Sequence, residues 1–169
     1  MSTHSVRPAT LALVVATVVA ADMVSKSVGE RLAPAAFAGA HNPDLAFGVA
    51  TASPLVLVAG TVLFLAVFVG FVGRWSVQMG LSPIPHAMIV GAMVAHIVDR
   101  IRFGAVRDFL GTPWGIIDVA DIAVLIGVVM LGVALVLRLR ALHRNAATIR
   151  FEARTLRAVV VDERYPRAA

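Results

Sequence analysis

The sequence predicts an all-α membrane protein with four transmembrane helices and an extramembrane loop between the first two, in which a small β element is one option. Of its 169 residues, 59% are hydrophobic and only 15% are charged, with a mean hydropathy of +0.88. Soluble domains carry far more charge. Four apolar stretches also approach the length of about 20 residues that a helix needs to cross a bilayer. We divide the chain into a bundle domain, 1–137, and a basic tail, 138–169.

The first apolar stretch is Ala9–Ala21, and it has two interpretations. It resembles a cleavable secretory signal, with Val19-Ala20-Ala21 suited to cleavage. Alternatively, the apolar face continues to Leu32, and Asp22 and Lys26 lie one helical turn apart as i,i+4 partners. We favour a retained first transmembrane helix with this pair at its end.

The next segment, Ala33–Pro54, is rich in proline and glycine, which interrupt helices. We predict an extramembrane loop here, in which 45–50 forms a short strand or lies against the membrane surface. Leu55–Val72 contains no charged residue and predicts the second spanning helix. Gly73-Arg74-Trp75 is expected to end this helix, because arginine and tryptophan suit the headgroup region.

Ile84–Val98 predicts the third helix, in which Gly91 and Ala95 are spaced for close contact with a neighbouring helix. Residues 101–116 contain three glycines and a proline, so we expect them to leave the helix. Ile117–Leu137 predicts the fourth helix, with two aspartates in its first turns. Acidic side chains there interact favourably with the helix dipole.

The basic tail fixes the predicted orientation. Residues 138–169 hold eight arginines against three acidic residues, which accounts for the whole net charge of +5. Basic segments beside spanning helices mark the cytoplasmic side. Four crossings then put both termini in the cytoplasm, and the loop 33–54 and the region 99–118 outside. Three arginines lie in the region predicted to be outside and do not follow the rule that basic residues mark the cytoplasmic side: Arg100, Arg102 and Arg107. We expect aspartates to neutralise them.

The same tail has a second interpretation, which is nucleic-acid binding. It lacks interleaved aromatic residues and any known nucleic-acid motif, so we predict contact with membrane lipids and no nucleic-acid partner. The chain also has no cysteine, which excludes disulfides, thiolate metal sites and a cysteine nucleophile.

Ionisable residues concentrate in Gly91–Ala123, between two apolar segments. A carboxylate at membrane depth is costly unless it is paired or hydrated, so such a cluster indicates a functional site. We predict that Asp108 and Asp121 meet at the outer interface and share a proton, which separates their pKa values. Peptide hydrolysis needs that separation, since one carboxylate activates water while the other carboxyl group hydrogen-bonds the scissile carbonyl.

Three alternatives stay open for this cluster. Asp121 is also suited to start a helix, and Asp108 to pair with Arg107 or Arg102, which would make both structural. A second alternative is a site that binds a divalent cation or relays protons. Its candidate ligands are His96, Asp99, Asp108, Asp118 and Asp121. The third is a purely structural membrane subunit.

Five segments in order resemble motifs of the lipoprotein signal peptidases, also called signal peptidase II. The family patterns are D-x-x-x-K, N-x-G-A-A-F-G, G-A-x-G-N-x-x-D-R, G-x-V-x-D-F and W-P-A-F-N-x-A-D. The matching segments are Asp22-Met-Val-Ser-Lys26, Asn42-Pro-Asp-Leu-Ala-Phe-Gly48, Gly91-Ala-Met-Val-Ala-His96-Ile-Val-Asp99-Arg100, Gly104-Ala-Val-Arg-Asp108-Phe109 and Trp114-Gly-Ile-Ile-Asp118-Val-Ala-Asp121. The resemblance covers residues 22–123.

The resemblance implies a four-helix aspartic peptidase of the bacterial cytoplasmic membrane, which removes signal peptides from diacylglyceryl-modified prolipoproteins. It implies Asp108 and Asp121 as the catalytic pair, with water as second substrate and no cofactor or metal. Asn42 would lie on a loop over the substrate, and Asp99 and Arg100 would brace the end of the third helix. For Asp22 and Lys26 we favour a structural role.

The sequence departs from the family patterns at several positions. His96 and Asp118 stand where the family carries asparagine, and Ala95 stands for a glycine. Asp44 and Leu45 replace a Gly-Ala step, and the segment between the two catalytic aspartates looks shortened. Asp118 adds a carboxylate, which we expect to raise the proton affinity of the pair, while His96 as a cation would offset it. A divergent member with altered substrate or low activity is therefore the runner-up.

Overall fold

The computed structural model describes residues 6–34, 41–43, 53–113 and 115–164, and side chains as far as residue 152. The chain divides into two compact units, Met1–Gly132 and Val133–Ala169. In these described ranges, four helices are long and apolar enough to cross a membrane: Pro8–Leu32, Pro54–Gln78, Ile84–Phe103 and Val119–Glu152. The predicted class, a four-helix membrane protein, is confirmed.

Helix α1 (Pro8–Leu32) begins with proline, whose fixed backbone angle suits the first helical position. It passes through Val19-Ala20-Ala21 without a break and packs along α5 (Ile84–Phe103). The retention of this helix stays a prediction. The second crossing begins as α3 (Pro54–Val67), where the Ser53 hydroxyl caps the Val56 N–H at 3.4 Å. It continues through a π-helical segment, Phe68–Gly73, into α4 (Arg74–Gln78).

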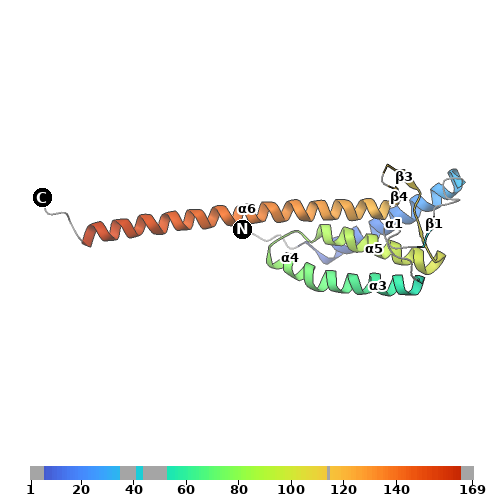
Figure 1. Ribbon diagram of the computed structural model, residues 1–169, viewed down its shortest axis with the longest axis horizontal. Helices are drawn as coiled ribbons and strands as arrows, with labels where there is room; N and C mark the ends of the chain where they lie inside the picture. Colours follow the sequence, from blue (N-terminus) through green and yellow to red (C-terminus); the bar gives the residue numbers. More distant parts are fainter. Residues whose placement is uncertain (1–5, 35–40, 44–52, 114, 165–169) are drawn as a thin grey trace. The chain divides into compact units, whose positions relative to one another are not determined.

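Helix α5 packs against α1 and α3 (Figure 1). Small residues allow this, because a Cβ added at Gly91 would lie only 2.9 Å from the Val18 Cβ of α1. The close contact predicted at Gly91 is therefore confirmed. The buried core beside it consists of small side chains, namely Ala92, Ala95, Ala120 and Ala123. Such residues let helix backbones approach closely in a membrane.

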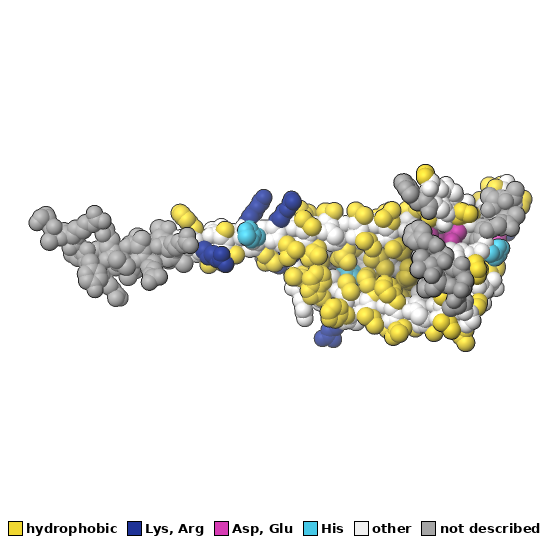
Figure 2. All heavy atoms as spheres, in the orientation of Figure 1, with side chains coloured by type: hydrophobic (Ala, Val, Ile, Leu, Met, Phe, Trp, Pro, Cys, Tyr) yellow, Lys and Arg dark blue, Asp and Glu magenta, His cyan; other side chains and the backbone are white. Residues whose placement is uncertain are grey.

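Large apolar side chains face outward instead, among them Leu13, Leu63, Phe71 and Leu125. Figure 2 shows hydrophobic side chains spread over the visible face of the helices in the first unit. In water this surface would be unfavourable, whereas in lipid it is the expected exterior.

Two short strand pairs lie between the helices. Strand β1 (His41–Asn42) pairs antiparallel with β2 (Val106–Arg107), with Asn42 opposite Val106. Strand β3 (Leu110–Thr112) pairs antiparallel with β4 (Gly115–Ile117), with Leu110 opposite Ile117. The strand considered at 45–50 lies outside the described residues, so β1 is the β element that the structure describes in the first loop.

Three predicted helix boundaries were wrong. Helix α5 runs on to Phe103. It ends there because Gly104, the next residue, adopts a left-handed φ of 75° that does not continue the helix. The final helix, α6 (Val119–Arg164), starts after Ile117, since that residue belongs to β4. The second crossing reaches Gln78 rather than ending at 73–75. Helix α6 also passes 137–138 without a break, so the domain boundary there stays a prediction.

Candidate active site

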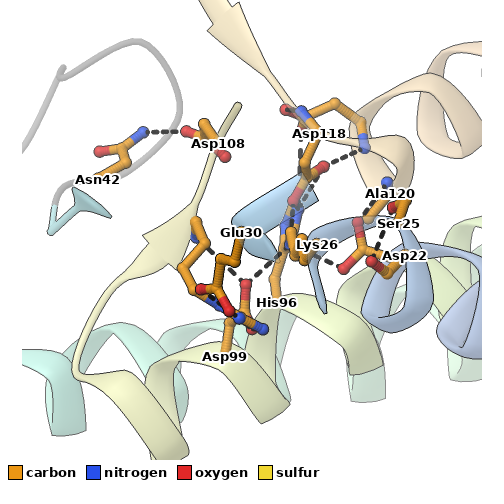
Figure 3. A network of polar contacts seen from close by, with 12 residues as sticks. Asp22, Ser25, Lys26, Glu30, Asn42, His96, Asp99, Asp108, Asp118 and Ala120 are labelled. Carbon is orange, nitrogen blue, oxygen red and sulfur yellow. Dashed lines mark hydrogen bonds and ion pairs between the residues drawn. The ribbon is translucent and has the colours of Figure 1, made fainter. Parts of the chain in front are cut away.

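Lys26 lies at the centre of a buried group of carboxylates (Figure 3). Its Nζ lies 2.7 Å from Asp22 Oδ2, 2.8 Å from Asp99 Oδ2 and 2.6 Å from Asp118 Oδ2. All four side chains are fully buried. An ammonium group has three protons to donate, and here each has an acceptor. The lysine therefore joins α1, α5 and the residue before α6.

The carboxylates around Lys26 also accept hydrogen bonds from other residues. Asp22 Oδ1 accepts the backbone N–H of Ala120 at 3.0 Å, which ties α1 to the first turn of α6. Asp99 Oδ1 accepts from Arg107 Nη2 at 2.8 Å and Nε at 3.2 Å, and its Oδ2 accepts the Arg107 backbone N–H at 3.1 Å. Arg107 Nη1 also donates to Glu30 Oε1 at 2.9 Å.

These contacts show the partners of Asp99 and correct one predicted pairing. Asp99, expected with Arg100 to brace the end of the third helix, forms its ion pairs with Lys26 and Arg107. Arg107 was one expected partner of Asp108, but its guanidinium turns to Asp99 and Glu30. The reason is geometric, since Arg107 and Asp108 are neighbours on an extended backbone, where successive side chains point to opposite sides. Arg100 itself is buried near the end of α5.

Asp118 and Asp121 form a reciprocal cap at the start of α6. Asp118 Oδ1 accepts the N–H of Asp121 at 2.8 Å, and Asp121 Oδ2 accepts the N–H of Asp118 at 3.3 Å. This arrangement satisfies backbone donors that a helix start leaves free. Asp121 thus starts the helix, as one interpretation of the sequence expected. Its side chain stays 39% exposed, whereas Asp118 is fully buried.

His96, from the middle of α5, contacts both aspartates. Its Nε2 lies 3.2 Å from Asp118 Oδ2 and 3.7 Å from Asp121 Oδ1. Burial would raise the pKa of Asp118, but the hydrogen bond and charge of His96, together with Lys26, outweigh it and lower this pKa to about 2. The two positions that depart from the family patterns, His96 and Asp118, are therefore direct neighbours.

Asp108 lies at the end of β2, and strand pairing brings Asn42 to it. Asn42 Nδ2 donates to Asp108 Oδ2 at 3.0 Å (Figure 3). Asp108 is only 6% exposed, and its Oδ1 has no hydrogen-bond partner within the described part of the chain. Burial raises the pKa of Asp108 to about 6; Asn42 opposes this, while the charges of Asp118 and Asp121 add to it.

Among the described residues, two groups of side chains have the spacing of metal ligands. His96, Asp118 and Asp121 bring their ligand atoms within 4.8 Å of one another, as do Asp22, Asp99 and Asp118. The Lys26 ammonium already occupies the second group. Only the first group therefore suits a cation, and it holds three of the five residues proposed as ligands from the sequence. An imidazole with two carboxylates is a donor set that suits zinc.

Sequence reasoning missed the central position of Lys26. It assigned the Asp22–Lys26 pair a local role, and that pair does exist, but the lysine also binds Asp99 of α5 and Asp118, which directly precedes α6. Lys26 is the single lysine of the sequence and follows a strongly apolar stretch. A lone cation in that position was the signal that could have identified it.

Comparison with known proteins now assigns a family. The sequence pattern of the family described as Signal peptidase (SPase) II matches residues 14–137, well over half of the chain. The chain belongs to this family. The resemblance drawn from the five motifs is thereby confirmed, and the chain shares its family with bacterial lipoprotein signal peptidases.

Individual lipoprotein signal peptidases match at moderate identity. The protein of Moorella thermoacetica is 33% identical over 92 residues, 54% of this chain and 61% of the relative. That of Syntrophus aciditrophicus is 32% identical over 112 residues, 57% of this chain and 66% of the relative. That of Pelotomaculum thermopropionicum is 27% identical over 139 residues, 74% and 90% of the two chains. The chain thus spans somewhat under two thirds of the first two relatives.

Two solved structures share the fold of this signal peptidase II family member. Both are described as bacterial membrane enzymes, determined by the in meso method at 2.3 Å and 1.9 Å resolution. The first has a TM-score of 0.59 at 20% identity and covers 76% of this chain and 88% of its own. The second has a TM-score of 0.61 at 19% identity, covering 80% and 97%. At such identities the likeness concerns the fold.

Proposed function

We propose that this chain is a membrane aspartic endopeptidase that removes the signal peptide from diacylglyceryl-modified prolipoproteins, with Asp108 and Asp121 as its catalytic pair. Membership in the signal peptidase II family supports the reaction class. The observation that carries the residue assignment is the carboxyl group of Asp108. It is buried, its pKa is raised to about 6, and its Oδ1 lacks a partner in the described residues.

In this proposal the two carboxyl groups divide the work. Burial raises the proton affinity of Asp108. This residue therefore carries the shared proton on Oδ1 and donates it in a hydrogen bond to the scissile carbonyl oxygen. Asp121, more exposed and ionised, takes a proton from water as the water oxygen bonds to the carbonyl carbon. The tetrahedral intermediate then collapses and the C–N bond breaks. The leaving nitrogen receives the proton that Asp121 took from water, and Asp108 keeps or regains its own proton as the carbonyl re-forms. The pair titrates as a unit, so its apparent pKa values belong to both groups.

The proposal extends to substrate and orientation. The substrate is a prolipoprotein, cut before its lipid-modified cysteine. The exposed apolar side chains of the helices suit contact with membrane lipids. Both termini lie in the cytoplasm and the carboxylate cluster at the outer face, because the basic tail follows the last crossing.

The test measures signal-peptide release from a diacylglyceryl-modified prolipoprotein by the purified full chain. Asp108→Asn and Asp121→Asn are each expected to lower the rate by about 10²–10⁴-fold, because proton transfer loses one participant. Glu152→Gln, which alters an exposed carboxylate on α6, is the control and should leave the rate unchanged. Cleavage that persists in both variants would show that Asp108 and Asp121 are not the catalytic pair.

The same assay separates the metal alternative, which the spacing of His96, Asp118 and Asp121 keeps as second candidate. Loss of activity in chelator, with recovery on adding a divalent cation, would favour a metal-dependent reaction. Unmodified prolipoprotein should not be cut. Its equal cleavage would favour a divergent member with a different substrate.

A further inference from the structure

In the described part of the site the aspartates outnumber the permanent cations, which are Lys26, Arg100 and Arg107. Lys26 is shared among three fully buried carboxylates, Asp22, Asp99 and Asp118. Arg107 divides its guanidinium between Asp99 and Glu30. Asp121 lies beside Asp118, and among the described residues neither Lys26 nor Arg107 forms an ion pair with it. The carboxylates of Asp118 and Asp121 are therefore close neighbours, and two like charges at such a distance disfavour each other's ionised form.

His96 is placed to supply the missing charge. Its Nε2 lies between Asp118 Oδ2, at 3.2 Å, and Asp121 Oδ1, at 3.7 Å, and only 12% of its side chain is exposed. The groups that face it come from three further elements. They are Lys26 from α1, Asp108 at the end of β2, and Asp118 and Asp121 at the start of α6, while Asp99 and Arg100 follow one turn on along α5.

We propose that His96 and Asp118 form a single charged unit that positions the carboxylate of Asp121. Asp118 holds Asp121 through the reciprocal cap, with Oδ1 on the Asp121 N–H, and His96 fixes Asp121 Oδ1 from the other side. His96 is a positioning residue in this scheme, since it acts through the two aspartates. The inference rests on the proposed function, because Asp121 is taken there as the residue that activates water.

The charges make the two positions interdependent. With Asp118 present and His96 absent, a second carboxylate would stand beside Asp121 with only a share of Lys26 to neutralise it. With His96 present and Asp118 absent, the imidazole would lose its closest acceptor. Asparagine at both positions removes both charges together while keeping hydrogen-bonding groups, and asparagine also caps helices well. Each single change should therefore be worse than the double change.

The experiment is a double-mutant cycle on the purified full chain, with wild type, His96→Asn, Asp118→Asn and the double variant. We expect each single variant to lower kcat by about tenfold with KM within about twofold of wild type, and the double variant to return to within about threefold. The KM is spared because neither side chain is proposed to bind substrate. Single effects that simply add in the double variant would overturn the inference.

The pH profile supplies a second readout. In His96→Asn the charge that lowers the pKa of Asp118 is gone, so this carboxylate takes up its proton at higher pH and the acid limb of kcat moves upward. His86→Asn is the matched control, because His86 is a buried histidine of the same helix bonded to Ser76 at 3.0 Å. It should leave the shape of the pH profile unchanged. An equal shift in both variants would overturn the inference.

Unfolding midpoints keep this inference distinct from the proposed function. If the wild type cleaves no prolipoprotein, or Asp108→Asn and Asp121→Asn still cleave, the proposed function fails. The four midpoints still report the pairing, because coupled charges destabilise the single variants more than the double variant. Non-additive midpoints support the His96–Asp118 unit, and additive midpoints overturn it.

Discussion

At the scale of the residue, Lys26 shows how a charge is kept inside an apolar bundle. Its three carboxylate partners come from different parts of the sequence, and each partner has at least one further donor. A buried ion pair stabilises little compared with apolar packing, yet removing one member leaves an unpaired charge at high cost. The lysine is thus a structural requirement for the residues that surround the candidate catalytic pair.

Lys26→Met should destabilise the protein by about 3–5 kcal/mol, because three buried carboxylates lose their shared cation. Chemical or thermal unfolding in detergent measures the change. Arg31→Met, an exposed cation in the last turn of the same helix, is the control and should change stability by about 0.5 kcal/mol or less. A loss in Lys26→Met no larger than in this control would contradict the assignment.

At the scale of the element, the pairing of β1 with β2 connects the first loop to Asp108. Two hydrogen-bonded residues on each strand bring the Asn42 amide to the Asp108 carboxylate. The donor stabilises the ionised form, so it holds the pKa of Asp108 lower than burial alone would. A strand pair of this size therefore adjusts the proton affinity of a candidate catalytic group.

Asn42→Ala should raise the pKa of Asp108 further above about 6 and move the alkaline limb of kcat/KM to higher pH, because Asp108 is proposed to act in its protonated form. The carboxyl pKa is already above its ordinary value of 3.8, so this group stabilises the fold most at low pH and less as pH rises through about 6. The variant extends that loss to higher pH. Rate profiles and unfolding midpoints against pH measure both effects.

His41→Ala is the matched control for this experiment, because His41 is the exposed neighbour of Asn42 on the same strand. It should leave the alkaline limb of kcat/KM where it is. If Asn42→Ala moves the alkaline limb downward, or not at all, Asn42 does not govern the protonation of Asp108.

At the scale of the whole molecule, the four crossings and the basic tail predict which side of the membrane holds the site. The chain has no cysteine, so single cysteines report accessibility without background. Gly111→Cys on β3, where an added Cβ meets nothing within 4 Å, should react with a membrane-impermeant thiol reagent applied to intact cells. Ala147→Cys on α6 should react only after permeabilisation. The reverse pattern would overturn the orientation.

The sequence by itself determined the four spanning helices, because an uninterrupted apolar run has no other stable place than lipid. It also located the ionisable cluster, since charge at membrane depth is costly wherever it occurs. The motifs identified the family, which the match over residues 14–137 confirms. The assignment of Asp108 and Asp121 as catalytic stays a prediction.

Only the tertiary structure decided which ionisable side chains pair with one another. Lys26 and Asp118 are 92 positions apart, and Lys26 and Asp99 are 73 apart, so no local pattern relates them. Asp99 and Arg107 meet because Gly104 turns the chain back after α5, which the order of residues alone does not reveal. The contact of His96 with Asp118 likewise depends on how α5 packs against the start of α6. Side-chain partners in a helix bundle follow from packing between helices, whereas the helices follow from hydrophobicity along the chain.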